Sequence, residues 1–221
     1  MKVLIGCEES QAVCIAFREL GHEAYSCDLQ ECSGGHPEWH IKGDVLKEAY
    51  GGGYDLMIAH PPCTYLSYAG TAHWNNSGRL KKRLKALEFF ANLWEAPIER
   101  ICLENPKGCA SPTITKYSQE IQPYYFGDGH LKTTWLWLKN LPPLVWSESN
   151  NLFSEATSSG KPEPIYTDYT DKKRYFTDAT GGYHGEGNST LKRSKTFPGI
   201  AKAMAEQWGK LTISNSKHKV A

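Results

Sequence analysis

A cysteine that follows two prolines is the residue best placed for chemistry in this chain. The segment HPPCTYLSYAG, from His60 to Gly70, follows the apolar run YDLMIA, which predicts a buried strand. Two prolines fix the backbone φ angle and remove two amide donors, so they end a paired strand and form a rigid platform. Such a platform holds Cys63 in one place, as a nucleophile in covalent catalysis requires. Because most cysteines only pack in a core, this prediction depends on the pattern around Cys63.

Acidic residues follow or end two other predicted strands, and a further one lies in the segment Gly43-Asp44-Val45. Asp28 ends one of them, where a carboxylate can accept hydrogen bonds from two ribose hydroxyls. Asp44 is placed to accept a hydrogen bond from an adenine amino group, although a helix N-cap and a turn are the ordinary alternatives for Asp44 and Asp28. After the first strand, Gly6 allows a ligand to approach the backbone, and Glu8 or Glu9 suits a positively charged ligand. Together these residues predict an adenosine pocket.

The elements that must position these residues alternate between strand and helix. Apolar runs predict strands at Lys2–Gly6, His22–Asp28, Tyr54–Ala59, Arg100–Asn105 and Thr133–Leu138. Helical spacing predicts helices at Ser10–Gly21, Leu80–Ala96 and Phe197–Leu211, with Ser10 as an N-cap and Gly21 as a stop. This rhythm is typical of an α/β fold with a doubly wound, mostly parallel sheet. Ligands of such sheets bind beyond the carboxyl ends of the strands, which is where the candidate residues lie.

Two segments resemble motifs of the cytosine carbon-5 DNA methyltransferases. In the family, a Pro-Cys pair is followed after two residues by an aromatic or apolar residue and a serine, and then by a glycine; here Pro62-Cys63 is followed by Leu66, Ser67 and Gly70. A second hallmark, a Glu-Asn pair after a later strand, is present as Glu104-Asn105-Pro106. The resemblance covers Lys2 to Leu138 and the last predicted helix. It implies a Rossmann-like fold of the kind that binds S-adenosyl-L-methionine (SAM), with a small irregular insertion.

The resemblance also implies a reaction and its participants. The methyl donor is SAM, the product is S-adenosyl-L-homocysteine, and no metal is needed. Cys63 is the thiolate that adds to carbon-6 of cytosine, and Glu104 is the acid at ring nitrogen-3, with a pKa that burial raises. The residues expected at the cofactor are Gly6, Glu8, Ser10, Asp28, Asp44, Pro61, Thr196 and Phe197. The residues expected at the substrate are Pro62, Ser67, Asn105, Lys132, Thr134 and Arg193.

The chain departs from the family pattern in four places. The family's late Gly-Asn motif is replaced by SKTFPGIA, which contains Thr196 and Phe197. The first loop reads Gly-Cys-Glu-Glu-Ser where the family has Phe-Ala-Gly-x-Gly-Gly, and the family's two-arginine segment is matched only by Lys132. The large target-recognition domain is also missing. We therefore expect a minimal, divergent member with a SAM-binding core at 1–139, an insertion and small substrate-recognition segment at 140–195, a C-terminal helix at 196–213 that returns to the core, and a tail at 214–221.

The composition of the chain indicates where the protein is located and which partners it can bind. The chain has 221 residues, a net charge of +1 and seven cysteines without metal-binding spacing, which is typical of a soluble, cytoplasmic protein with reduced thiols. No run predicts a signal peptide or a membrane span. Proteins dedicated to duplex DNA usually carry a basic surface, so any such surface must be local here. The candidate basic segments are Arg79–Lys85, Lys172–Arg174 and Leu191–Lys195.

Four functions remain open at this level, and their order follows from the motifs. Methylation of cytosine in DNA comes first; the target base must then be flipped out, with the 140–195 insertion and its Tyr166, Tyr169, Tyr175 and Phe176 as the recognition element. The same chemistry on a free nucleotide, dCMP or dCTP, follows closely because the net charge is near zero. An amino-methyltransferase shares the two prolines but needs an acid or amide before them and an aromatic residue after them. A SAM-fold binding protein without catalysis would need neither Cys63 nor Glu104. The oligomeric state stays open.

Overall fold

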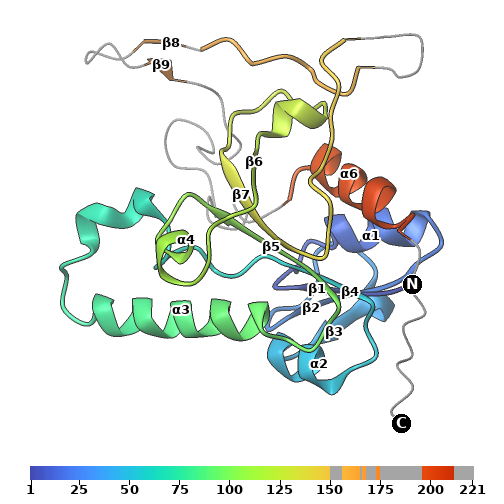
Figure 1. The fold of residues 1–221 in the computed structure, drawn as a ribbon, viewed down its shortest axis with the longest axis horizontal. Coiled ribbons are helices and arrows are strands. Elements are labelled where there is room, and N and C mark those ends of the chain that lie inside the picture. Colours follow the sequence, from blue (N-terminus) through green and yellow to red (C-terminus); the bar gives the residue numbers. More distant parts are fainter. Residues whose placement is uncertain (150–155, 165, 168–172, 175–195, 212–221) are drawn as a thin grey trace.

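A seven-stranded sheet organises the part of the chain that the computed structural model describes, which is residues 1–149, 156–164, 166–167, 173–174 and 196–211 (Figure 1). The strand order is β3-β2-β1-β4-β5-β7-β6, and β7 runs antiparallel to both of its neighbours. The strands are β1 (Lys2–Gly6), β2 (Glu23–Asp28), β3 (His40–Lys42), β4 (Leu56–Ala59), β5 (Arg100–Pro106), β6 (Gln119–Ile121) and β7 (Thr134–Lys139). The sheet is therefore mostly parallel, as the sequence predicts.

Helices cover both faces of this sheet, which makes the fold doubly wound. Helices α1 (Ala12–Glu19) and α6 (Pro198–Trp208) pack on one face, and α2 (Val45–Gly51) and α3 (Arg79–Trp94) pack on the other. The shorter elements are α4 (Ala110–Thr113) and the 3-10 turns η1 (Pro37–Trp39), η2 (Tyr68–His73) and η3 (Pro123–Phe126). This is the Rossmann-like α/β architecture that the sequence predicts.

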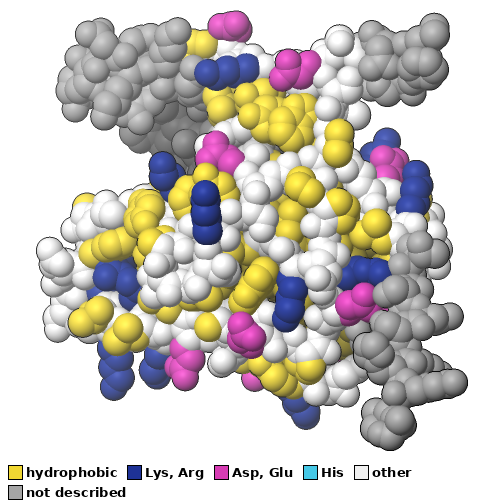
Figure 2. Space-filling view, in the orientation of Figure 1, with side chains coloured by type: hydrophobic (Ala, Val, Ile, Leu, Met, Phe, Trp, Pro, Cys, Tyr) yellow, Lys and Arg dark blue, Asp and Glu magenta, His cyan; other side chains and the backbone are white. Residues whose placement is uncertain are grey.

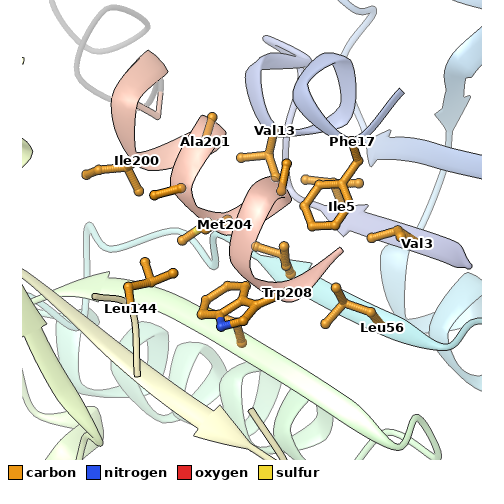
Figure 3. Packing of buried hydrophobic residues seen from close by; sticks show 14 of the residues in the cluster. Val3, Ile5, Val13, Phe17, Leu56, Leu144, Ile200, Ala201, Met204 and Trp208 are labelled. Atoms are coloured by element: carbon orange, nitrogen blue, oxygen red, sulfur yellow. The ribbon is translucent and has the colours of Figure 1, made fainter. Parts of the chain in front are cut away.

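Alternating side chains of the central strands separate the two layers of the core. In β1, Val3 and Ile5 belong to the layer beneath α1 and α6, whereas Leu4 belongs to the layer beneath α2 and α3. Figure 3 shows how α6 brings its apolar side toward α1 and the sheet; Met204 and Trp208 are completely buried there. The helix from the far end of the sequence thus packs against the first helix.

Local signals explain both the accurate and the inaccurate predictions of element ends. Gly21 ends α1 with a φ of +81°, a left-handed value that favours glycine, and Pro198 occupies the first turn of α6. The prediction that Ser10 caps α1 was wrong, because the helix begins at Ala12 with Gln11 at the N-cap position. Strands β3 and β6 and helix α2 were not predicted, since three-residue strands and a seven-residue helix carry little periodic signal.

The 140–195 insertion falls largely outside the described residues. Its described part includes the paired two-residue strands β8 (Tyr166–Thr167) and β9 (Lys173–Arg174). Tyr169, Tyr175 and Phe176 lie outside the described residues, as do Arg193 and the predicted tail at 214–221. The proposed recognition role of the insertion therefore stays a prediction. No helix in the described ranges is both long and apolar enough to cross a membrane.

Candidate active site

The turn after β4 presents Cys63 at the surface. Pro61 is buried, whereas Pro62 and Cys63 are exposed. The Cys63 carbonyl accepts hydrogen bonds from the backbone amides of Leu66 at 3.0 Å and Ser67 at 2.9 Å, which closes the chain into a tight turn. The other six cysteines are buried or half-buried. The two prolines follow the end of β4, and Cys63 lies directly after them on a hydrogen-bonded turn.

Backbone pairing joins this turn to the segment after β5. The amide of Tyr68 donates to the carbonyl of Lys107 at 3.0 Å, and the amide of Cys109 donates to the carbonyl of Leu66 at 2.9 Å. Gly108 lies between these two bonds, and a Cβ atom at that position would collide with the Leu66 carbonyl. The Pro-Cys segment and the Glu-Asn segment, some forty residues apart in sequence, are thus held side by side.

The side chain of Asn105 fastens the proline platform to β5. Its Nδ2 donates to the Pro61 carbonyl at 2.6 Å, and the residue is buried. Asn105 also has a buried Oδ1 for which the described part of the chain offers no hydrogen-bond partner. The sequence assigned Asn105 to the substrate and to the orientation of Glu104 or a nearby loop. The bond joins Asn105 to the loop after β4, and its role toward a substrate stays a prediction.

Replacing Asn105 with alanine should loosen the turn that carries Cys63. The change removes a buried hydrogen bond and leaves the Pro61 carbonyl unsatisfied, so the free energy of unfolding should fall by about 1–3 kcal/mol. Urea unfolding measures this loss, and amide hydrogen exchange at Leu66 and Ser67 should accelerate. Asn92→Ala, at an exposed position of α3, is the matched control and should change neither. Unchanged exchange at the Cys63 turn would mean that Asn105 does not hold the platform.

Glu104 lies near the end of β5 in a buried polar cluster. Its Oε2 lies 3.1 Å from His60 Nδ1, and its side chain is only 16% exposed. Burial raises the pKa of the Glu104 carboxyl, but the hydrogen bond with His60, the charges of Lys132 and His60, and a hydrogen bond from Thr134 outweigh burial. The pKa of Glu104 therefore lies below its usual range. The expectation of a raised pKa was wrong, because sequence alone did not show these partners.

His60 is the functional candidate that the sequence reasoning missed. It follows β4 directly, its side chain is 7% exposed, and its backbone amide donates to the Gly6 carbonyl at 3.0 Å. Its Nε2 is buried and has no hydrogen-bond partner among the described residues. An ionisable residue at the carboxyl end of a fully apolar strand was the signal that could have identified it.

Glu8 and Glu9 are already bonded within the protein. Glu8 is buried; its Oε1 accepts from the amide of Val13 at 2.7 Å and its Oε2 from that of Cys14 at 3.2 Å. Burial raises the pKa of Glu8, while the charge of His60 and these two bonds act in the opposite direction. The Glu9 carboxylate accepts a hydrogen bond from the Ser33 hydroxyl. Glu8 therefore satisfies the free amides at the start of α1, and its role toward a cofactor stays a prediction.

Asp28 and Asp44 approach the same point beyond the ends of β1, β2 and β3. Burial and then the charges of Asp28, Cys27 and Asp44 raise the pKa of the Cys7 thiol, so both carboxylates lie near Cys7. One oxygen of Asp28 accepts from the amide of Gln30, and one oxygen of Asp44 accepts from that of Leu46 as the N-cap of α2. The ordinary interpretations are thus correct as local structure. The second oxygen of each carboxylate accepts no hydrogen bond from the described residues, so the pair fits the hydroxyl and amino donors of an adenosine.

Of the remaining predicted residues, Lys132 and Thr134 lie near Glu104. Lys132 Nζ lies 5.6 Å from the centroid of the Phe197 ring, so this cation is near both Glu104 and the start of α6. Thr134 is buried beside Glu104. Ser67 uses its Oγ to accept from the amide of Ala69, which begins η2. Gly6 is buried at the end of β1, whereas Ser10 and Thr196 are half-buried.

Comparison with known proteins finds likeness only among solved structures. No protein-family model matches the sequence, and no curated protein matches it. The Entamoeba histolytica methyltransferase EhMeth is 11% identical, with a TM-score of 0.47, over 86% of this chain and 62% of its own. The Dnmt2 methyltransferase of S. pombe is 16% identical, with a TM-score of 0.46, over 77% of this chain and 62% of its own.

A mutant of Spodoptera frugiperda DNMT2 is also similar, at 15% identity and a TM-score of 0.40, over 80% of this chain and 61% of its own. The chain thus spans less than two thirds of the length of all three proteins. At identities of 16% and below, the likeness to these methyltransferases concerns the fold.

Proposed function

We propose that this chain is a SAM-dependent methyltransferase that modifies carbon-5 of cytosine in DNA through a covalent bond to Cys63. The observation that supports it is that the Pro-Cys segment and the Glu-Asn segment are held together at one edge of the sheet. An exposed cysteine lies on a proline platform that accepts a hydrogen bond from Asn105 of β5, and two backbone hydrogen bonds join the same turn to the segment after β5. A packing cysteine needs no such frame, and neither does a binding module.

The proposed reaction uses Cys63 and Glu104 on the same pyrimidine ring. The Cys63 thiolate forms a bond to carbon-6, and the electron pair of the carbon-5–carbon-6 double bond moves toward nitrogen-3, which takes a proton from Glu104. Carbon-5 is then nucleophilic. After carbon-5 has been methylated, a base removes its proton, the carbon–sulfur bond breaks, and nitrogen-3 returns its proton. Preorganised acid and nucleophile at a partly buried site are what this sequence of steps requires.

The edge of the sheet beside β1 offers the place for the cofactor. Asp28 would accept hydrogen bonds from ribose hydroxyls and Asp44 from the adenine amino group, with the oxygens that local structure leaves available. When bound, SAM supplies an electrophilic methyl group on a positively charged sulfur. The same loop carries the buried carboxyls of Glu8 and Glu9, whose expected role toward the cofactor's positive charge is part of this proposal.

A cationic and aromatic surface beside Cys63 favours DNA as the substrate. We call it the α3 basic surface; it consists of Tyr65, Trp74, Arg79, Lys82 and Arg83. The Arg79 guanidinium lies 5.0 Å and Lys82 Nζ 5.7 Å from the Tyr65 ring centroid, and Arg83 lies 3.9 Å from that of Trp74. Figure 2 shows Lys and Arg side chains among hydrophobic ones at the end of the molecule where Figure 1 draws α3. Cations interleaved with aromatic rings suit phosphates and unstacked bases.

Removing one cation from the α3 basic surface should weaken DNA binding and its salt dependence. Lys82 is exposed, and Lys82→Ala should reduce the slope of log affinity against log salt by about 1 if the ammonium neutralises one phosphate. Fluorescence anisotropy with a labelled duplex over a salt series measures this slope. Lys202→Ala, at a 73% exposed position of α6 on the other face of the sheet, should leave it unchanged. If Lys82→Ala and Lys202→Ala both keep the wild-type slope, the α3 basic surface does not contact DNA.

A free cytosine nucleotide is the second candidate substrate. The formal net charge of +1 favours it, because a mononucleotide needs only a small phosphate clamp and no base flipping. Lys132, beside Glu104 and Phe197, is the described cation best placed for such a clamp. The covalent chemistry is the same for both substrates.

Methyl transfer from labelled SAM tests the proposal directly. Cytosine-containing DNA, dCMP and dCTP are assayed in parallel with the wild type and Cys63→Ala. Label on DNA that disappears in the variant supports the proposal, and label on the nucleotides alone assigns the second candidate. Label that survives Cys63→Ala overturns the covalent mechanism in favour of an amino-methyltransferase. Binding of SAM without transfer to any cytosine substrate indicates a binding protein.

A further inference from the structure

The cluster around Glu104 raises a problem for the proposed chemistry. The reaction needs a proton at nitrogen-3 of the ring, but the lowered pKa of Glu104 keeps this carboxyl ionised at neutral pH. A carboxylate accepts hydrogen bonds and has no proton to donate. The proton must therefore come to Glu104 from a neighbour when the ring is attacked.

His60 is the neighbour with the required geometry. Its Nδ1 lies 3.1 Å from Glu104 Oε2, which is hydrogen-bond distance, and both side chains are shielded from solvent at 7% and 16% exposure. Histidine is the side chain that most often moves a proton within enzyme reactions. His60 also precedes the proline platform directly, so the platform fixes its position.

Charged and polar groups face this pair from both sides. Glu8 approaches from the loop after β1, and its charge interacts with that of His60. On the other side, Glu104 faces Lys132 from the loop before β7, the hydroxyl of Thr134, and the thiol of Cys102 in its own strand. Glu9, beside Glu8, adds a further carboxyl.

We infer that His60 is a positioning residue that supplies Glu104 with the proton destined for nitrogen-3 of the pyrimidine and takes it back at the end of the cycle. The inference rests on the proposed function and deepens it. An imidazolium carries protons on both nitrogens. The Nδ1 proton forms the bond to Glu104, and Nε2 is buried without a hydrogen-bond partner among the described residues.

During the attack, one proton moves from Glu104 to nitrogen-3 and another moves from His60 to Glu104. As the Cys63 sulfur bonds to carbon-6, nitrogen-3 gains a proton from Glu104, and Glu104 gains the Nδ1 proton of His60. The imidazolium becomes a neutral imidazole, and the net negative charge of the incoming thiolate is balanced. When Cys63 leaves, nitrogen-3 returns its proton to Glu104 and Glu104 returns one to His60. No oxidant, metal or further reactant takes part in this exchange.

His60→Asn separates proton supply from structure. Asparagine Nδ2 takes the place of His60 Nδ1 and can still donate to Glu104, but it carries no transferable proton near neutral pH. Single-turnover methyl transfer by the wild type and the variant is measured from pH 6 to 8. We expect the variant to be about 10²-fold slower at the alkaline end, the usual contribution of a positioned proton donor. Its rate relative to the wild type should rise by up to about tenfold per unit as the pH falls, because Glu104 then takes protons from solvent.

A second measurement reports on the pair without any reaction. The carboxyl carbon of Glu104, identified by its loss in Glu104→Gln, is titrated by NMR in the wild type and in His60→Asn. The pKa of Glu104 should be higher in the variant, because the positive charge of His60 is gone while the hydrogen bond stays.

The outcomes distinguish this inference from the proposed function. A pH-dependent rate ratio together with a raised Glu104 pKa supports the inference. A rate ratio that stays flat with pH, or a Glu104 titration that does not change, overturns it and leaves the methyltransferase proposal intact. A wild type that transfers no methyl group to DNA, dCMP or dCTP overturns the proposed function, and the inference with it.

Discussion

We expect Cys63→Ala to abolish methyl transfer, because no other side chain can replace the thiolate at carbon-6. Removing the nucleophile of a covalent mechanism costs several orders of magnitude, and we expect a loss of at least about 10³-fold in kcat. The covalent bond can be seen directly with a DNA duplex in which the target cytosine carries fluorine at carbon-5. Fluorine cannot leave as a proton does, so the adduct persists and migrates as a larger species in a denaturing gel. The wild type should form this species in the presence of SAM, and the variant should not.

The matched control for this experiment is Cys32→Ala. Cys32 is half-buried in the segment after β2 and has no part in the proposed chemistry. This variant should form the adduct and transfer methyl groups at the wild-type rate. Mass spectrometry of the digested adduct should locate the modification on Cys63. A modification on another cysteine would contradict the assignment of the nucleophile.

The sequence predicted those features of the site that depend on the position of a residue at the end of a strand or next to a proline. Gly6 ends β1, Asp28 ends β2 and Asn105 lies next to last in β5. Because ligands of such sheets bind at the carboxyl ends of parallel strands, the sequence predicted that these residues lie at one edge of the sheet. The Pro-Pro-Cys platform was also predictable, because proline acts on its own backbone. Strong apolar runs and amphipathic helices located the main elements to within a few residues.

What could not be predicted depends on contacts between residues far apart in sequence. Burial of Glu104 was foreseen, and burial alone raises the pKa of a carboxyl. The pKa of Glu104 is lowered instead, because of His60, which is forty-four residues away in sequence, and Lys132 on another loop. Glu8 likewise looked available to a ligand, yet it bonds the first amides of α1 because a helix N-terminus attracts a carboxylate. The spacing of residues along the sequence does not show whether a carboxyl such as that of Glu8 will bond to the protein itself or to a ligand.

Glu104→Gln should separate catalysis from binding. Glutamine keeps the size of the side chain and an oxygen that can accept from His60, so the cluster should remain assembled. It cannot pass a proton to nitrogen-3, and we expect kcat to fall by about 10²–10⁴-fold while the affinities for SAM and DNA change little. Single-turnover assays and anisotropy titrations measure the two effects. Glu88→Gln, at an exposed position of α3, is the control and should retain full activity.

The same substitution tests the direction of the Glu104 pKa through stability. Because the folded-state pKa lies below the usual value of about 4.3, the ionised carboxylate stabilises the fold above that pH. This contribution is lost as the pH falls through the folded-state pKa. The wild type should therefore be more stable than Glu104→Gln near neutral pH, and the difference should shrink on acidification, as measured by urea unfolding at pH 7 and below pH 4. A difference that grows with acid would mean that Glu104 is held neutral by burial, and the proton would then need no supply from His60.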